Sequence, residues 1–372
     1  MKSKIKIGGL QFFCLIFLFE LGSAVLFGMA KEAKQDAWIP ILLGIAGGCI
    51  LFSVYLGLHK RYPDLPLTSY SQQILGKYLG WVIGFGYVVY FSYLAARVLR
   101  DFEELLVISQ YHNTSLLTLG LYMIASIIYV MFKGFEVFSR LSQICLFLFL
   151  FTALPILLLE VSAQLLQPEN LLPLLENGWS PVIKALFPST ISVPFGEMVA
   201  FTMLLPLVKD YKTAKRFGYL GIIVSGLYLT FRTLMNIAAI GTDARMRSTF
   251  PVLTEIGLVE IGDFIQRLDS LILIILVILG FVKIFIFFYC AVLGLGDLFK
   301  LKKPDKMIYP LGILIIFTSV FIAPNFNTHL EIGFKIVPIY LHLPFQMAIP
   351  IILLLVALIK SKIKKSRTKQ PN

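Results

Sequence analysis

Long apolar runs recur along the whole chain and restrict it to one kind of architecture. Ten such runs are separated by polar residues, prolines or glycines, and a helix of roughly 20 apolar residues crosses the hydrocarbon core of a bilayer. Only 15% of the 372 residues are charged, against about 25% in a soluble domain. One aqueous core cannot bury this apolar excess, so the sequence predicts an all-α integral membrane protein. The predicted spans are 8–30, 38–58, 79–108, 116–132, 139–160, 181–207, 214–240, 266–296, 307–323 and 336–359.

The segments between these spans are too short for a separate soluble domain of about 50 residues. We therefore expect one polytopic membrane domain over residues 1–372, with no detachable catalytic unit. Two connecting segments, 63–76 and 250–266, have an amphipathic helical pattern and are expected to lie at the membrane surface.

The basic residues predict the orientation of the chain. With the N-terminus in the cytoplasm, about two thirds of the 33 Lys and Arg residues fall on the cytoplasmic side, including a basic tail at 360–372. This bias agrees with the positive-inside rule and places both termini in the cytoplasm. The net charge of +12 then reflects this bias and an attraction to anionic membrane lipid, so no nucleic-acid partner is expected.

Two predicted spans are interrupted near their middles. The first contains Gly22, Ser23 and Ala24, and the sixth contains the stretch from Ser192 through Val193, Pro194 and Phe195 to Gly196. Glycine and proline weaken the helical hydrogen-bond ladder, and free backbone groups inside a membrane need protein, water or a ligand as partners.

Interruptions at matching places in two halves are typical of a transporter-type site. Spans 1 and 6 of ten imply a five-plus-five inverted repeat, with a first repeat at about 8–160 and a second at about 181–359. The bare helix ends suit a zwitterion such as an amino acid, so these eight residues are the candidate ligand-binding residues. The alternative is that both breaks are only helix-packing or kink sites.

Three ionisable residues are predicted to lie deep in the membrane: Glu20, Glu197 and Lys283. A charge at the bilayer centre costs about 2.5–3.5 kcal/mol on lenient scales, so each needs a partner or a role. One hypothesis pairs Lys283 with Glu20 or Glu197 and lets it replace, or respond to, a coupling ion or proton. The other is a static ion pair that holds the bundle together.

Further charges cluster toward the outer end of span 3, where Arg97 and Asp101, and Arg100 and Glu104, are spaced four residues apart. They predict an interfacial collar of charged residues, or alternatively an outer gate. Arg232 and Asn236 of span 7 are candidates for the same collar. Tyr90 and Tyr93 are candidates to line a cavity from span 3.

Catalytic and cofactor signatures are missing from the sequence. His59 and Asp64 match an acyltransferase-like spacing, but they occupy a short loop without the other sequence blocks of such enzymes. The remaining histidines and the four cysteines have no metal-ligand spacing, and no nucleotide-binding or nucleophile motif occurs. We expect no metal, no cofactor and no enzymatic activity.

The stretch from Gln11 to Ala24, the ten-span layout and the stretch from Phe187 to Glu197 resemble the spore-germination permease family. This resemblance implies the amino acid–polyamine–organocation superfamily and a LeuT-type fold. It also implies an inner spore membrane location, a complex with a larger membrane subunit and a lipoprotein subunit, and the sensing of a small nutrient such as an amino acid. The alternative function is an ion- or proton-coupled secondary amino-acid transporter, since both functions need the same broken-helix pocket.

Overall fold

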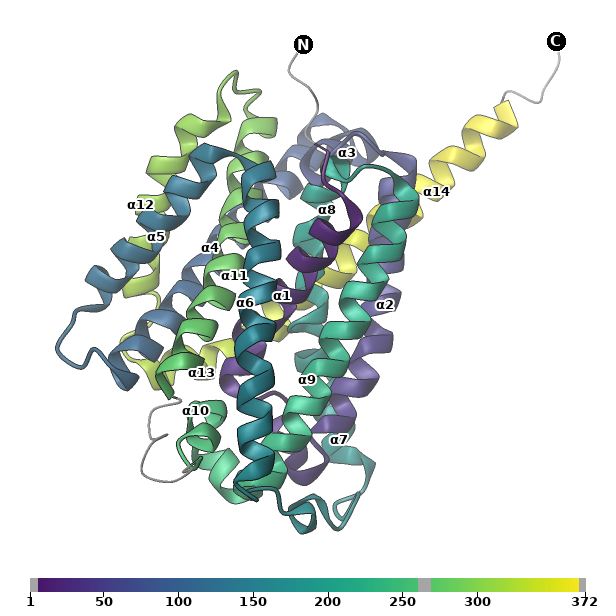
Figure 1. Ribbon diagram of the computed structural model, residues 1–372. Coiled ribbons are helices and arrows are strands. Elements are labelled where there is room, and N and C mark those ends of the chain that lie inside the picture. Colours follow the sequence, from purple (N-terminus) through teal and green to yellow (C-terminus); the bar gives the residue numbers. More distant parts are fainter. Residues whose placement is uncertain (1–5, 260–268, 368–372) are drawn as a thin grey trace.

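The structure, a computed structural model, describes residues 6–259 and 269–367, and every regular element within these ranges is helical (Figure 1). Ten helical segments are long and apolar enough to cross a membrane, which confirms the predicted number. They are α1 (Gly9–Phe27), α2 (Trp38–Arg61), α4 (Lys77–Ser109), α5 (Leu116–Lys133), α6 (Phe135–Ser162), the interrupted segment Trp179–Leu207, α9 (Tyr211–Arg247), α11 (Asp269–Leu298), the segment Pro304–Phe321 ending in α12 (Ile308–Phe321), and Pro338–Ile363.

The predicted boundaries agree with these segments to within a few residues, with two exceptions at span ends. The helix α9 continues seven residues beyond the predicted end, to Arg247. The last span consists of a π-helix, Pro338–Ala348, followed by α14 (Ile349–Arg367), so part of the expected basic tail is helical. The predicted start of span 8, at 266–268, lies outside the described residues.

Both amphipathic connections contain short helices. The first forms α3 (Leu67–Leu75), which packs so closely against α4 that a Cβ at Gly80 would lie 2.3 Å from the Cα of Gln72. Only glycine permits this backbone-to-backbone approach. The second forms α10 (Pro251–Ile256), and residues 260–266 of that prediction lie outside the described residues.

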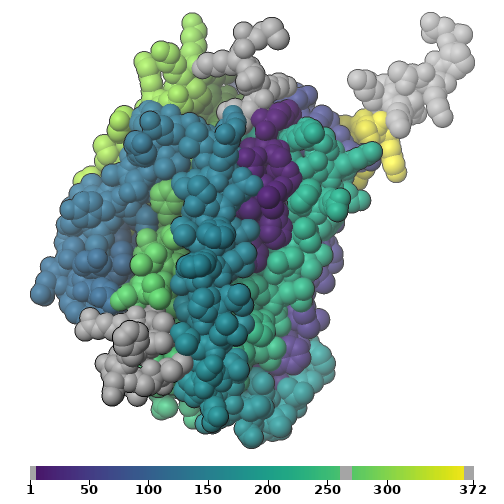
Figure 2. All heavy atoms as spheres, in the orientation of Figure 1, coloured from purple at the N-terminus to yellow at the C-terminus, as the bar shows by residue number. Residues whose placement is uncertain are grey.

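The ten spans divide into an inner and an outer group. In α1 and in the segment Trp179–Leu207, 78% of the apolar stretch is buried inside the protein, against 22% in α5 and α6. Figure 2 shows α6 across the front surface, with only a strip of α1 visible between α6 and α9. The inner spans carry the buried Glu20, Glu197 and Lys283, whereas α5 and α6 expose leucine and phenylalanine side chains, the chemistry that lipid favours.

The two interrupted spans are joined at one end of the bundle. Ile7, just before α1, donates its N–H to Leu207 O (2.9 Å) and accepts from Lys209 N (3.1 Å), at the end of the second interrupted span. The start of α1 and the end of α14 lie at this same end of the molecule (Figure 1). The backbone pairing therefore fixes the depth of one interrupted span against the other.

Candidate functional site

The first helix loses its regular geometry at Gly22, where φ is −4° and ψ is −112°. The side chain of Lys283, from α11, passes directly over this point: a Cβ at Gly22 would lie 2.4 Å from Lys283 Cδ. The break therefore has two effects, since it turns the α1 backbone and makes room for a lysine from the neighbouring span.

The second interruption is longer. The segment runs from α7 (Trp179–Ala185) through a π-helical turn at Leu186–Thr190, a turn at Val193 and Pro194, and a 3₁₀ helix at Phe195–Ala200. The Phe195 ring lies against Gly44 and Gly48 of α2. These glycines let α2 support the broken segment closely.

Ion-pair geometry connects the two breaks. Lys283 Nζ lies 2.6 Å from Glu197 Oε2, just after the second break, and donates to Ser23 Oγ at 3.1 Å, just after the first. The same ammonium lies 5.3 Å from the centre of the Phe19 ring, a cation–π distance. Lys283 and Glu197 are almost fully buried. Of the two predicted partners, Lys283 therefore pairs with Glu197, and Glu20 instead contacts the Ser225 hydroxyl of α9.

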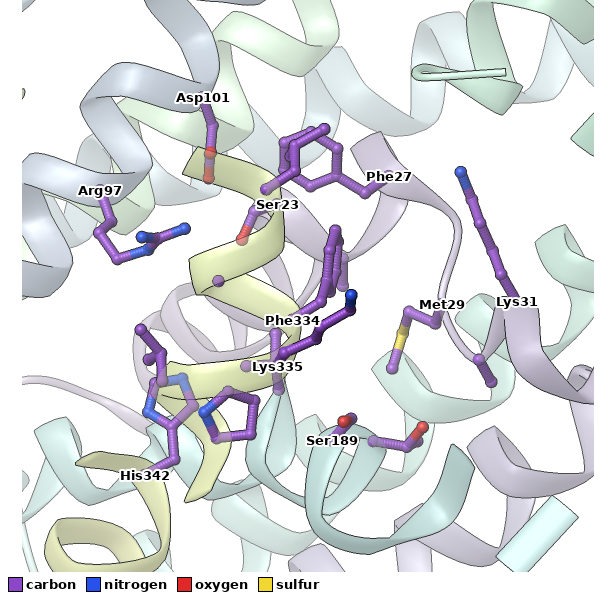
Figure 3. A pocket seen from close by; sticks show the side chains of 18 of the residues that line it. Ser23, Phe27, Met29, Lys31, Arg97, Asp101, Ser189, Phe334, Lys335 and His342 are labelled. Atoms are coloured by element: carbon purple, nitrogen blue, oxygen red, sulfur yellow. The ribbon is translucent and has the colours of Figure 1, made fainter. Parts of the chain in front are cut away.

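A cavity of about 410 Å³ opens beside this ion pair. Its mouth is formed by Lys31, Glu32, Glu331 and Lys335, at the end of the bundle away from the start of α1. Figure 3 shows Arg97 and Asp101 reaching in from α4, with Ser23, Phe27 and Met29 contributed by α1 and the residues after it. Apolar side chains such as Phe27, Leu94, Val98, Phe334 and Val337 make up much of the wall.

The predicted site residues divide into two groups. Ser23, Ala24 and Val193 line the cavity, together with Glu197 and Arg97. The other five candidate ligand-binding residues are buried against neighbouring helices; they are Gly22, Ser192, Pro194, Phe195 and Gly196. They shape the backbone on which the lining residues stand.

The charges of α4 are arranged differently from the prediction. Asp101 does not pair with Arg97: its carboxylate lies 2.7 Å from His329 Nε2, in α13 (Phe326–Glu331). Arg97 donates to the His329 backbone oxygen at 2.8 Å, and its Nη1 is buried without a hydrogen-bond partner in the described structure. Spacing along one helix could not reveal His329, because α13 lies more than 200 residues further along the chain.

The remaining span-3 pair forms as predicted, with Arg100 Nη2 2.8 Å from Glu104 Oε1. Arg100 also donates to the backbone oxygens of Ser319 and Val320 at the end of α12. Neither Arg100 nor Glu104 lines the cavity. This pair therefore joins α4 to α12 within the described structure.

Arg232 does not join this group and belongs to a separate cluster. Its guanidinium lies 2.8 Å from Glu160 at the end of α6 and 2.8 Å from Glu255 in α10, and both carboxyl groups are buried. Asn236 donates to Glu255 at 2.9 Å and to Pro251 O at 3.0 Å. Two acids surround one cation, so this cluster fastens α10 to the bundle through groups that the sequence analysis did not connect.

The cluster of Arg232, Glu160 and Glu255 gives a pH-dependent prediction. Burial raises the pKa of Glu255 from 4.5 to about 7; Arg232 opposes this shift and Glu160 adds to it. Between these pH values the folded protein holds a proton that the unfolded chain releases, so stability falls as pH rises through this window. The free energy of unfolding of the wild type should fall by up to about 1.4 kcal/mol per pH unit in this window, and the Glu255→Gln variant should lose this slope. Unfolding measured across a pH series tests this.

The matched control is Glu331→Gln. Glu331 is exposed at the cavity mouth, and its hydrogen bond with Lys335 lowers its pKa. This control should keep the wild-type slope between pH 4.5 and 7. An unchanged slope in the Glu255→Gln variant would refute the assignment of the proton to Glu255.

A buried polar network lies beside the cavity. His342, in the π-helical part of the last span, lines the cavity, and its Nδ1 lies 2.7 Å from the Tyr90 hydroxyl. Gln346 donates to the same hydroxyl at 2.9 Å. Tyr90 and Tyr93 do not themselves line the cavity, and Tyr93 lies beneath the Arg97 guanidinium.

Two tyrosines clamp this part of the last span. Pro350 has no N–H, so the Gln346 carbonyl lacks its usual helical donor. Tyr55 of α2 donates to that oxygen at 2.7 Å, and Tyr87 of α4 donates to Phe345 O at 2.7 Å. The part of the last span that begins at the cavity-lining His342 is therefore held by hydrogen bonds from two other spans, α2 and α4.

This arrangement, ten spans with paired breaks around a central cavity, has the same fold as solved structures of secondary transporters. One solved structure with the same fold is Mhp1, a nucleobase-cation-symport-1 family transporter in a closed conformation with bromovinylhydantoin bound (TM-score 0.62, 13% identity, 89% of this chain and 75% of that chain). A substrate-bound, outward-open Na⁺-coupled sialic acid symporter also matches (TM-score 0.64, 10% identity, 91% and 80%). The predicted LeuT-type fold, with its five-plus-five repeat and breaks in spans 1 and 6, is confirmed.

Sequence comparison identifies the family. Residues 6–327 match the family model described as spore germination protein. Spore germination protein KB of Bacillus subtilis (strain 168) is 40% identical over 361 residues, covering 96% of both chains, and spore germination protein A2 of the same organism is 27% identical over 296 residues, covering 78% of both. The chain belongs to the spore germination protein family, as the resemblance implied, and is a multi-pass, permease-like membrane protein.

Proposed function

We propose that this chain is the transporter-like subunit of a spore germinant receptor, and that its central cavity binds a small nutrient, an amino acid in particular, to help trigger germination. The observation that carries this proposal is the placement of opposite charges on one cavity of about 410 Å³, with Arg97 and Asp101 of α4 on one wall and Glu197 of the second interrupted span on another. Ligand cavities of about 300–1,000 Å³ with few, well-placed polar groups are typical of small-molecule sites.

The pattern of satisfied and unsatisfied groups supports a zwitterionic ligand. The unpartnered Arg97 Nη1 is a donor for a carboxylate. Glu197, which lines the cavity, is an acceptor for an ammonium group in competition with Lys283. The apolar wall then accommodates an aliphatic side chain.

The subunit partners, location and orientation belong to the same proposal. A larger membrane subunit and a lipoprotein subunit would complete the receptor in the inner spore membrane, with both termini cytoplasmic and the cavity mouth facing outward. The family membership and the asymmetric distribution of Lys and Arg support this arrangement.

Arg97 provides the test of the ligand class. Purified protein is titrated with a panel of amino acids, sugars and nucleosides by calorimetry. For the amino acid that binds, Arg97→Gln should weaken binding by about 1.5–3 kcal/mol, roughly 10- to 150-fold, because a charge-assisted bond to the carboxylate is lost. The methyl ester of that amino acid should bind wild-type protein weakly and gain nothing from Arg97.

If Arg97→Gln weakened binding of the amino acid and of its methyl ester by the same factor, a contact between Arg97 and the carboxylate would be contradicted. Binding of sugars or nucleosides alone would replace the amino-acid assignment. The alternative function, coupled secondary amino-acid transport, predicts substantial uptake into proteoliposomes that contain only this chain. Binding without turnover in the same vesicles favours the receptor.

A further inference from the structure

The central charges do not balance. Three ionisable side chains, Glu20, Glu197 and Lys283, are buried where α1, the second interrupted span and α11 meet. Lys283 is the one cation among them, and its ammonium lies 2.6 Å from Glu197. If both acids were ionised, one buried negative charge would be left over, and an uncompensated charge in a low-dielectric interior costs several kcal/mol.

The excess falls on Glu20. This side chain is fully buried, its Oε2 contacts Ser225 Oγ, and its Oε1 has no hydrogen-bond partner in the described structure. A bare carboxylate oxygen is far more costly to bury than the bare carbonyl oxygen of a carboxylic acid. The surroundings thus suit the neutral acid.

Proton counting at Ser225 agrees with a neutral Glu20. The Ser225 hydroxyl has one proton and three oxygen neighbours: Glu20 Oε2, Gly221 O at 2.8 Å and Ile222 O at 3.1 Å. When Glu20 is protonated, its O–H donates to Ser225 Oγ, and the Ser225 proton is free for a helix carbonyl. Two protons then serve the three contacts, whereas an ionised Glu20 leaves one proton for all three.

Among the described groups around Glu20, the one cation that can stabilise its ionised form is Lys283. Lys283 of α11 and Glu197 act on it electrostatically, α9 contributes the neutral Ser225, and Cys49 of α2 lies nearby. Lys283 also contacts Phe19, the residue before Glu20 on α1, and Ser23, three residues after it. If Lys283 is released from Glu197, Glu20 is therefore the carboxyl group with which it can pair next.

We propose that Glu20 is a proton-binding site linked to the cavity through Lys283. With Lys283 on Glu197, Glu20 holds a proton and the three groups sum to zero charge. When a cationic group in the cavity takes Glu197, Lys283 turns to Glu20, whose O–H bond breaks and whose proton leaves to solvent. One positive charge is bound and one is released, so charge is conserved. Only this exchange, not the proton site itself, rests on the proposed ammonium contact.

Infrared difference spectroscopy of the purified protein at neutral pH tests the proton site without any ligand. The wild type should show a C=O stretch of a buried carboxylic acid that is missing from Glu20→Gln, whereas the contribution of the partly protonated Glu255 should be the same in both spectra. Glu197→Gln should lose the same band although Glu20 is still present, because Lys283 then ionises Glu20. The matched control, Glu104→Gln, removes an acid already paired with Arg100 and should keep the band.

Ser225→Ala covers the case in which Glu20→Gln does not fold. Loss of the hydrogen-bond acceptor should shift the acid band rather than abolish it. An unchanged spectrum in folded Glu20→Gln or in Ser225→Ala would overturn the proton site. Retention of the full band in Glu197→Gln would overturn the link through Lys283. Neither result depends on which nutrient binds, so failure here is distinguishable from failure of the proposed function.

Discussion

Replacement of Lys283 by methionine is expected to destabilise the protein by about 3–5 kcal/mol, because breaking a buried ion pair leaves the remaining charge without compensation. Glu197 loses its 2.6 Å partner, and Ser23 loses a donor at 3.1 Å. Chemical unfolding of the purified protein in detergent measures the change. Any surviving Lys283→Met protein should also have an uncoupled nutrient response, since Lys283 bridges both breaks.

Two controls separate the buried pair from general effects. Lys335→Met removes an ion pair of similar length, 2.9 Å to Glu331, but both side chains are exposed, so stability should not change measurably. The double variant Lys283→Met, Glu197→Gln should recover most of the loss, because no unpaired charge remains at Glu197. Wild-type stability in Lys283→Met would exclude an energetic role for the pair.

Replacement of Ser23 by phenylalanine is expected to abolish ligand binding while the protein still inserts. Ser23 lines the cavity and accepts a hydrogen bond from Lys283. A phenyl ring there fills space beside the ion pair that the ligand would occupy. We expect overpacking and the lost hydroxyl together to cost on the order of 3 kcal/mol or more of binding free energy, which is over 100-fold in affinity. Titration with the binding amino acid and a germination dose–response measure this.

Ser126→Phe is the matched control. Ser126 is exposed on α5, on the lipid-facing side, so the same substitution there should leave both curves unchanged. Gly196→Leu is a less specific probe, because a Cβ at Gly196 would lie 2.1 Å from Gln346 Oε1 and disturb packing outside the cavity wall. A normal dose–response in Ser23→Phe would move the ligand site away from the first break.

The sequence predicted more of the fold than of the site. Span number, the two breaks and the depth of Lys283 follow from local composition, since glycine, proline and charge act within a few residues of where they occur. Arg100 pairs with Glu104 as predicted, and Lys283 pairs with one of its two predicted acids, but the other interaction partners did not follow. Asp101 binds His329 of a short helix between spans, and Arg232 binds Glu160 and Glu255. None of these three partners lies on the same helix as the residue that it binds.

The lining residues show the same limit. Both breaks were located correctly, but the residues that line the cavity could not be predicted from them. Phe195 of the second break turns toward glycines of α2, whereas His342 of the last span lines the cavity. Which side of an irregular backbone faces a cavity depends on the neighbouring helices, so a motif identifies the segment and not its exposed atoms.

The amino-acid sequence alone determined that this chain fills a bilayer with ten helices and interrupts two of them, because hydrophobicity and helix-breaking residues are local properties. Tertiary structure decided which of two acids receives the ammonium of Lys283, and left Glu20 with a hydroxyl as its partner. That choice depends on distances of a few ångströms between side chains from four different spans. In a medium without water to screen it, such a distance determines where the charge resides.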